Sequence, residues 1–267
     1  MANSESPPLT AATLTAGLRA CGVGEGQTVL VQMAMSKLGF VVGAAQAVAD
    51  GLLAAVGPSG TIVVPTHSAD NSEPSHWQHP PVPESWWPLI REHTPAYNPL
   101  NTPTRQMGAV AELLRRWPGA LRSSHPAFSL AAIGPNAAYI TAEHELGDDT
   151  GERSPLGALY RLDGHVLLIG VGHGNNSSLH LAERRAQLPP KVKLTNGSAM
   201  LVDGERRWVT YEAIDLSSDD FETVGAAFEA EHGVPIQRLG GADVRFFRQR
   251  ACVDFAAAWM QVNRTSR

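Results

Sequence analysis

The stretch that decides the fold is residues 154–183, which read SPLGALYRLDGHVLLIGVGHGNNSSLHLAE. The apolar run 166–169 is short and lies between glycines, a pattern typical of a buried strand. Residues 170–176 are too rich in glycine for a helix, whereas Ser177 or Ser178 can cap a helix that follows. The segment therefore predicts a helix, a strand, a glycine-rich loop and a second helix, in that order.

The second of these helices carries His180 and Glu183, whose spacing places them on the same helix face. A carboxylate beside an imidazole holds one tautomer and raises the basicity of the other ring nitrogen. Because the pair follows a buried strand, we expect it at the carboxyl edge of the sheet, where open α/β folds place their sites. Taken alone the pattern is weak, since the same spacing occurs on ordinary solvated helix faces.

The composition is that of a globular chain, with 267 residues and an apolar fraction of 43%. We expect no membrane span, because no apolar run reaches about 18 residues, and no secretion signal, because residues 1–8 are polar. Cys21 and Cys252 lie far apart and predict reduced core thiols in a cytoplasmic protein. The net charge of −5 argues against nucleic acid and is compatible with a polycationic small molecule.

Near the N-terminus the sequence predicts a βαβ unit made of strand 28–32, helix 44–56 and strand 61–64. Such a connection makes the two strands parallel, so both end at the same edge of the sheet. We therefore expect Gln32 and His67 to lie near each other at that edge. Other elements are expected as helices at 10–21, 107–117, 137–141, 221–232 and 248–261, strands at 129–133 and 244–247, and a hairpin of 198–202 with 207–211.

Together these elements predict an α/β fold with a mostly parallel central sheet, flanking helices and a C-terminal antiparallel hairpin, in one domain spanning residues 1–267. Residues 70–104 differ, because their Pro, Trp and His content cannot form a long strand. We interpret them as an irregular insertion or lid with a short helix at 84–92. Its tryptophans argue against disorder and either anchor the insertion or contact a ligand: Trp77, Trp86 and Trp87.

Several motifs together resemble the aminoglycoside N3-acetyltransferases, a family of acetyl-CoA-dependent antibiotic-resistance enzymes that are not of the GNAT fold. The family pattern SPL-x-x-L-x-x-LDG-x-VLLLGVG, followed by an Asn or Asp pair and (T/S)SLHLAE, is matched by residues 154–183. The chain also matches PPVPE-x-WW at 80–87, TPTR-x-MG at 102–108 and R-S-x-HP at 122–126. The resemblance extends over nearly the whole length.

The resemblance implies acetyl transfer from acetyl-CoA to an amine, with His180 as the base and Glu183 orienting it. A base placed in this way is typically worth ~10²–10⁴-fold in rate. Ser178 or an amide N–H of residues 172–176 is a candidate for stabilising the oxyanion. Candidates for holding the cofactor are Ser36, Lys37, Leu38, Gly39, Arg122, Ser123, Ser124 and Ser178. Candidate carboxylates for a cationic acceptor are Asp70, Glu84, Asp148, Asp149 and Glu183.

The remaining histidines have weaker signals. His125 lies in the R-S-x-HP motif and is either structural or catalytic. His173 is expected to be an ordinary loop residue, and three histidines of the insertion are expected to be surface residues: His76, His79 and His93. No cluster of His, Cys and Asp has the spacing of a metal site, so we predict no metal.

One departure from the family pattern follows the first strand, where most members have His-Ser-Ser and this chain has Gln32, Met33 and Ala34. An amide cannot act as a base. Our hypothesis is that His67 partly replaces the missing imidazole. A Gln32→His exchange that gains no rate, together with a His67→Ala variant that loses none, would contradict it.

Three functions therefore remain open. The first is acetyl-CoA-dependent N-acetylation of aminoglycosides, at the 3-amino group, and the second is acetylation of another bacterial amine. The third is a non-catalytic protein that binds CoA or a cationic ligand, because Gln32 replaces the usual histidine. We expect a cytoplasmic monomer or homodimer whose partner is an aminoglycoside or a similar polyamine, with no nucleic acid and no membrane.

Overall fold

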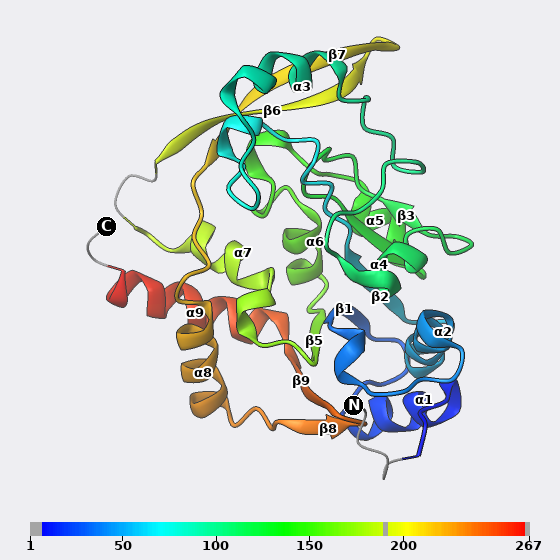
Figure 1. The fold of residues 1–267 in the computed structure, drawn as a ribbon. Helices are drawn as coiled ribbons and strands as arrows, with labels where there is room; N and C mark the ends of the chain where they lie inside the picture. Colours follow the sequence, from blue (N-terminus) through cyan, green and yellow to red (C-terminus); the bar gives the residue numbers. More distant parts are fainter. Residues whose placement is uncertain (1–6, 189–191, 265–267) are drawn as a thin grey trace.

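A seven-stranded sheet forms the centre of the molecule, in the order β3-β4-β2-β1-β5-β9-β8 (Figure 1). The computed structural model describes residues 7–188 and 192–264, so predictions for residues 1–6 and 189–191 lie outside the described residues. The strands are β1 Thr28–Met33, β2 Thr61–Pro65, β3 Leu121–Arg122, β4 Leu130–Ile133, β5 His165–Ile169, β8 Gln237–Leu239 and β9 Ala242–Arg248.

The parallel part of the sheet is its centre. β1 pairs in parallel with both β2 and β5, as the βαβ interpretation predicts. β4 pairs antiparallel with β2, and β9 pairs antiparallel with β5. The α/β class is therefore confirmed, while the expected mostly parallel sheet has antiparallel pairs on both sides of its three central strands.

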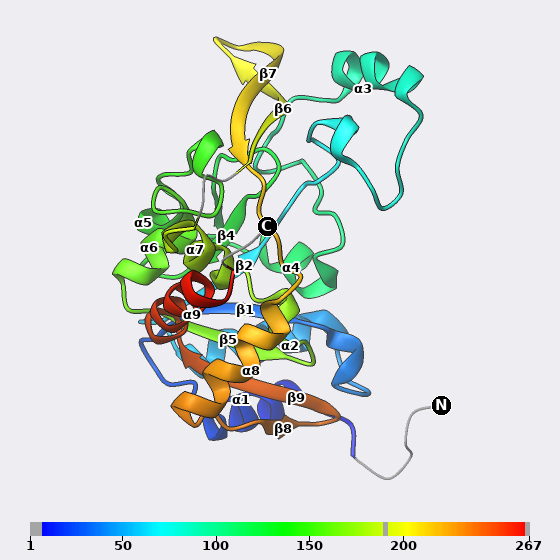
Figure 2. The ribbon, with the colours of Figure 1, turned by 90° about the vertical axis from the view of Figure 1, so that its left-hand side faces the viewer.

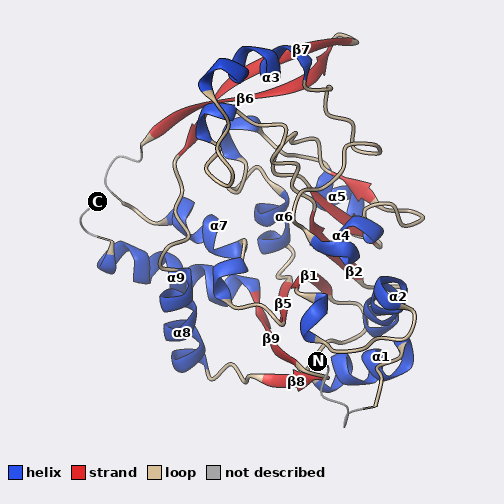
Figure 3. Cartoon of the chain, in the orientation of Figure 1, coloured by secondary structure: helices blue, strands red, loops and turns tan. Residues whose placement is uncertain are grey.

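Helices cover both faces of the sheet (Figure 3). The strand residues alternate between two cores, so that Val29 and Val31 face one core and Leu30 faces the other. The first core is covered by α1 Ala11–Ala20, α2 Ala44–Val56 and α4 Gly108–Leu114. The second is covered by α5 Ala137–Thr141, α6 Pro155–Arg161, α7 Ser178–Arg185, α8 Phe221–His232 and α9 Gln249–Asn263. Cys21 and Cys252 are buried free thiols within these cores.

The insertion and the hairpin form a second layer beyond the sheet (Figure 2). The hairpin consists of β6 Lys193–Val202 and β7 Glu205–Ile214, and the insertion contains α3 Trp87–His93 after a short 3-10 turn. Asn71 holds the two together, because its side chain donates to the Ala199 carbonyl at 2.9 Å and accepts from the Ala199 amide at 2.7 Å. The short helix expected at 84–92 is confirmed as α3 with the turn before it, and the segment is anchored rather than loose.

Within the described residues, we find no helix long and apolar enough to cross a membrane. The longest, α9, is amphipathic and packs against α7 and α8. The helices therefore serve to enclose the sheet and to position the loops at its carboxyl edge.

Candidate active site

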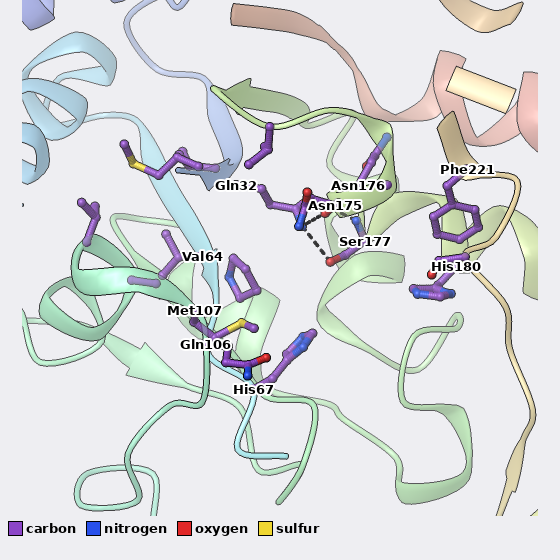
Figure 4. Close-up of a pocket in the computed structure, with 18 residues that line it drawn as sticks. Gln32, Val64, His67, Gln106, Met107, Asn175, Asn176, Ser177, His180 and Phe221 are labelled. Carbon is purple, nitrogen blue, oxygen red and sulfur yellow. Dashed lines mark hydrogen bonds between the residues drawn. The ribbon is translucent and has the colours of Figure 1, made fainter. Parts of the chain in front are cut away.

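The loops that follow β1, β2 and β5 converge at the carboxyl edge and enclose a first cavity of about 230 Å³ (Figure 4). Gln32 and His67, predicted to be neighbours at this edge, line this same cavity. Gly170 allows the convergence, because its φ is +66° and an added Cβ would lie 2.5 Å from the Lys37 Cβ. Apolar side chains complete much of the wall: Val31, Val64, Met107, Val110, Val171 and Phe221.

α7 presents His180 and Glu183 on one face, as the sequence predicts. The Nδ1 of His180 lies 3.2 Å from Oε2 of Glu183, and the ring packs edge-on against Phe221 with centroids 4.7 Å apart. Nδ1–H therefore donates to the carboxylate, which leaves Nε2 as the acceptor. Because His180 also lines the cavity, this acceptor can take a proton from a bound amine.

Glu183 is itself held in place from the other side. Its Oε1 accepts from the Ser217 amide at 2.9 Å and from the Arg264 guanidinium at 2.7 Å. Burial alone would raise the pKa of Glu183, but the hydrogen bonds from His180 and Ser217 and the charge of Arg264 outweigh it and hold the pKa below its usual value. The carboxylate thus stays ionised beside the imidazole.

A second cavity of about 450 Å³ also has His180 in its wall. His67, Ser177, His180 and Ser218 line both cavities. The second cavity is bounded by the insertion, by the hairpin and by the acidic segment that follows it, through residues that include Ser72, His76, Trp77, Asn196, Asp149 and Asp215. A third cavity of about 250 Å³ continues from His67 towards Asp70, Trp77, His79 and Arg105.

Gln32 spans from β1 to the loop before α7. Its Nε2 donates to the carbonyl of Asn175 and, at 2.9 Å, to Oγ of Ser177, while its Oε1 accepts from the Ser177 amide at 3.1 Å. Ser177 is the N-cap residue of α7, but the side chain that caps the helix is that of Asn176, which accepts from the Ser178 amide at 3.1 Å. The expectation that Ser177 or Ser178 caps the helix is therefore confirmed for the N-cap position, Ser177, although its side chain makes no capping bond.

His67 stands where all three cavities meet. Burial, together with the nearby imidazoles of His144 and His180, lowers the pKa of His67 to about 4. The ring is neutral at pH 7 and is a weak proton acceptor. The value does not favour His67 as a substitute base, although its place at the junction fits a residue that contacts substrate.

The cofactor candidates divide into two groups. Ser36 and Lys37 are exposed in the short 3-10 turn Met35–Lys37 directly after β1, and Gly39 is exposed beside them. Leu38 is instead buried in the first core. Ser124 is exposed and lies outside the walls of the three cavities.

Three other cofactor candidates are used inside the protein, which corrects the expectation from sequence. Arg122 donates to the side chains of Thr66, Ser68 and Ser129 and to three backbone carbonyls, those of Thr66, Pro99 and Thr102. Ser123 is fully buried and its Oγ lies 2.9 Å from Nδ1 of His144. Ser178 is fully buried and accepts from Gln249 at 3.1 Å. The two serines are closed off from solvent, and the donors of Arg122 are engaged within the protein.

The carboxylate candidates are likewise divided. Asp149 lines the second cavity but is paired with Arg184, and Asp148 lies 3.6 Å from the same guanidinium. Asp70 lines the third cavity beside Arg105, and Glu84 lies on the insertion away from all three cavities. Asp215 was missed as a site residue. Its signal was the acidic run 215–220 that follows the hairpin.

Two other histidines have structural roles. Nδ1 of His125 accepts from the amides of Ala127 and Phe128 at 3.1 and 3.0 Å, so His125 is a buried structural residue. His173 is not an ordinary loop residue, because it is buried and its Nε2 lies 3.0 Å from Oε1 of Glu229.

The insertion histidines are exposed, as expected, but His76 and His79 line cavities. In the described ranges 7–188 and 192–264, no group of His, Cys, Asp and Glu is arranged for a metal ion.

Comparison with known sequences gives consistent matches. The sequence model of the aminoglycoside 3-N-acetyltransferase family matches residues 30–261. The SPbeta prophage-derived aminoglycoside N(3')-acetyltransferase-like protein YokD of Bacillus subtilis (strain 168) is 42% identical over 253 residues, covering 94% of this chain and 92% of YokD. Aminoglycoside N(3)-acetyltransferase VII of Streptomyces paromomycinus is 35% identical over 268 residues, covering 95% and 92%.

Solved structures agree with this result. The crystal structure of YokD matches with a TM-score of 0.94 at 40% identity, covering 98% of this chain and 97% of that one. A structure of AAC-VIa bound to sisomicin matches with a TM-score of 0.87 at 30% identity, covering 98% and 100%. A structure of AAC-IIIb with CoASH matches with a TM-score of 0.86 at 28% identity, covering 96% and 97%. The similarity extends along nearly the whole chain.

Proposed function

Because this chain belongs to the aminoglycoside 3-N-acetyltransferase family, we propose that it transfers the acetyl group of acetyl-CoA to the 3-amino group of an aminoglycoside and so confers resistance. The observation that carries the proposal is the place of His180. Its ring is braced by Glu183 and lines both the first and the second cavity. A base that lines two adjoining cavities can act where an amine in one meets a thioester in the other.

We assign the first cavity to the acetyl end of acetyl-CoA and the second to the acceptor. The first cavity combines apolar side chains such as Met107 and Phe221, which suit an acetyl group and the end of the pantetheine arm, with hydrogen-bonding groups such as Ser177. The turn that exposes Ser36 and Lys37 follows shortly after Met33 of its wall, which supports assigning these two residues to the phosphates of CoA. The relative AAC-IIIb has been solved with CoASH.

In the second cavity, Asp215 and Asn196 supply oxygen atoms for the ammonium groups of the acceptor, among the mainly apolar residues of its hairpin side. Asp149 lies on the same wall, but Arg184 neutralises much of its charge. Trp77 closes this side, held by the bond from its Nε1 to Ser72 at 2.8 Å, so we propose that residues 70–104 form a wall of the acceptor site. The relative AAC-VIa has been solved with sisomicin, an aminoglycoside.

The proposed step needs one base and no covalent enzyme intermediate. The acceptor nitrogen attacks the thioester carbonyl carbon, and Nε2 of His180 takes the proton from that nitrogen. Collapse of the tetrahedral intermediate breaks the C–S bond and releases CoA as a thiolate, which then takes up a proton. Glu183 stabilises the imidazolium that forms, because its ionised carboxylate already holds Nδ1–H.

A thiol-release assay with acetyl-CoA and a panel of aminoglycosides, sisomicin among them, tests the proposal. We expect CoA release that depends on the acceptor, and mass spectrometry with NMR to place one acetyl group on the 3-amino nitrogen. Acetylation of other amines alone would favour the second function. Thermal stabilisation by CoA without turnover on any amine would favour a non-catalytic binder, the alternative that Gln32 raises.

A further inference from the structure

The transition state of acetyl transfer places negative charge on the thioester oxygen, which needs a hydrogen-bond donor. The backbone of the glycine-rich loop cannot supply it from His173 onward. The amides of His173 and Gly174 donate to Glu222, and those of Asn175 and Asn176 donate to carbonyls within the loop. The Ser177 amide donates to Gln32. The loop amides expected from the sequence to hold the oxyanion are therefore occupied from His173 onward.

The side chain of Ser178 is also excluded, because it is fully buried and bonded to Gln249. Ser177 remains. It lines both the first and the second cavity, as His180 does, and the two residues lie three apart on the same side of α7 (Figure 4). A donor at Ser177 and an acceptor at His180 therefore face the same junction.

Gln32 determines which way the Ser177 hydroxyl points. The amide of Gln32 cannot be reversed, because Oε1 would then meet the Asn175 carbonyl and Nε2 would meet the Ser177 N–H. Nε2 can only donate, so Oγ of Ser177 must accept at 2.9 Å. Among the described residues no other hydrogen bond to this hydroxyl is found. Its own O–H is left to donate into the cavity.

We propose that the Ser177 hydroxyl donates to the thioester oxygen in the transition state, and that Gln32 is the positioning residue that aims this hydroxyl. The inference rests on the proposed acetyl transfer. The oxygen gains negative charge as the amine nitrogen bonds to the carbonyl carbon, and loses it when the C–S bond breaks. The Ser177 proton stabilises the charge without being transferred.

The same geometry explains why a glutamine suits position 32. An amide offers two donor hydrogens and an acceptor, and all three contacts from Gln32 to Asn175 and Ser177 use them. A neutral imidazole has one donor and one acceptor and can make at most two of the three. Gln32 thus fits a positioning role that a histidine at this place would fill less completely.

Steady-state kinetics of Ser177→Ala and Ser177→Thr tests the donor. We expect Ser177→Ala to lower kcat by ~10²–10³-fold, the usual effect of removing one such donor, with KM for acetyl-CoA changed by less than about threefold. Ser177→Thr keeps the hydroxyl and should retain most of the activity. Melting curves with and without CoA establish that each variant folds and binds. Wild-type kcat in Ser177→Ala would overturn the assignment.

A double-mutant cycle tests the positioning role of Gln32. Gln32→Glu has the same shape but no donors at neutral pH, and we expect kcat to fall ~10-fold or more. In the Ser177→Ala background the same exchange should cost little further, because the hydroxyl it aims is gone. Independent, multiplying losses would overturn the role, and so would a gain of rate in Gln32→His.

The two proposals fail in different ways. A wild-type protein that turns over no amine overturns the acetyl transfer and this inference with it. An active wild type whose kcat is insensitive to Ser177→Ala overturns only the inference.

Discussion

The histidines around the cavities occupy two contrasting environments. His180 has a carboxylate on Nδ1 and open cavities beside it. His125 and His144 have only neutral partners: His125 accepts from two amides and faces the Leu146 carbonyl, and His144 lies between the Ser123 hydroxyl and the Asp149 carbonyl. Burial lowers the pKa of His125 to about 4 and that of His144 to about 3.

The difference teaches that partner and exposure, rather than residue type, decide the role of a histidine. In His144, Nε2–H donates to the Asp149 carbonyl and Nδ1 accepts from Ser123, so each nitrogen is satisfied in the neutral ring. A proton added to Nδ1 would displace that bond. His180 instead gains a counter-charge when it is protonated. The first environment stabilises the fold and the second supports proton transfer.

The largest expected effect comes from removing one histidine of each kind. His180→Ala should lower kcat by ~10²–10⁴-fold, because it removes the proton acceptor, with little change in melting temperature. His125→Ala should leave kcat of the folded protein within about threefold. It should lower the free energy of unfolding by about 2–4 kcal/mol, because two buried amides lose their acceptor. Thiol-release kinetics and urea unfolding of both variants measure the contrast.

The contrast between His180 and His125 is contradicted if both variants lose kcat, or if both lose only stability. His93→Ala is a matched control, since His93 is exposed on the insertion away from the three cavities. It should change neither kcat nor stability.

Acid should act on the buried histidines next. The pKa of an unperturbed histidine is 6.5. Below that pH, His125 and His144 bind protons in the unfolded chain but remain neutral in the folded protein. Their contribution to stability is complete above pH 6.5 and is lost as the pH falls towards 4 for His125 and towards 3 for His144. The loss is about 1.4 kcal/mol per pH unit for each histidine. Urea unfolding at pH 7.5, 5.5 and 4.5 measures it, and His144→Asn should flatten the dependence. An unchanged slope in that variant would contradict the explanation.

Local patterns were sufficient for much of the fold. The predicted helix 44–56 is α2 to the residue, and the two strands that flank it are parallel. The motif in residues 154–183 predicted both the pairing of His180 with Glu183 and the family, and both are confirmed. These successes share a cause: helix period, strand length and motif spacing are properties of neighbours in the sequence.

What could not be predicted depends on partners distant in the sequence. Arg122 looked available for a phosphate, but its partner Thr66 lies 56 residues away. The sequence around Asp149 is acidic and suggests a free carboxylate, but in the structure Asp149 pairs with Arg184. From the sequence, Gln32 stands where a catalytic histidine is expected. Its contacts with Ser177, which lies 145 residues away, could not be predicted. Composition and spacing carry no information on such pairings.

A smaller effect tests whether the charge on Glu183 matters to His180. Glu183→Gln keeps an acceptor for Nδ1–H but removes the counter-charge for the imidazolium, so we expect kcat to fall by ~10-fold or more. Asp220→Asn is the matched control, because Asp220 also pairs with Arg264, and no contact between it and His180 is found among the described residues. It should share any loss of stability but keep kcat. Equal losses of kcat in the two variants would assign the effect to Arg264 instead.

His67 gives the smallest expected effect, because it stands between the two environments. It lines all three cavities as a substrate contact would, yet its pKa of about 4 resembles that of the buried histidines. We expect His67→Ala to raise KM for the acceptor and to lower kcat by less than about tenfold, since a weak acceptor contributes little as a base. His67→Gln, which keeps a hydrogen-bonding side chain, should restore most of KM. A loss in His67→Ala as large as that in His180→Ala, with no rescue by glutamine, would instead make His67 the replacement for the missing histidine at position 32.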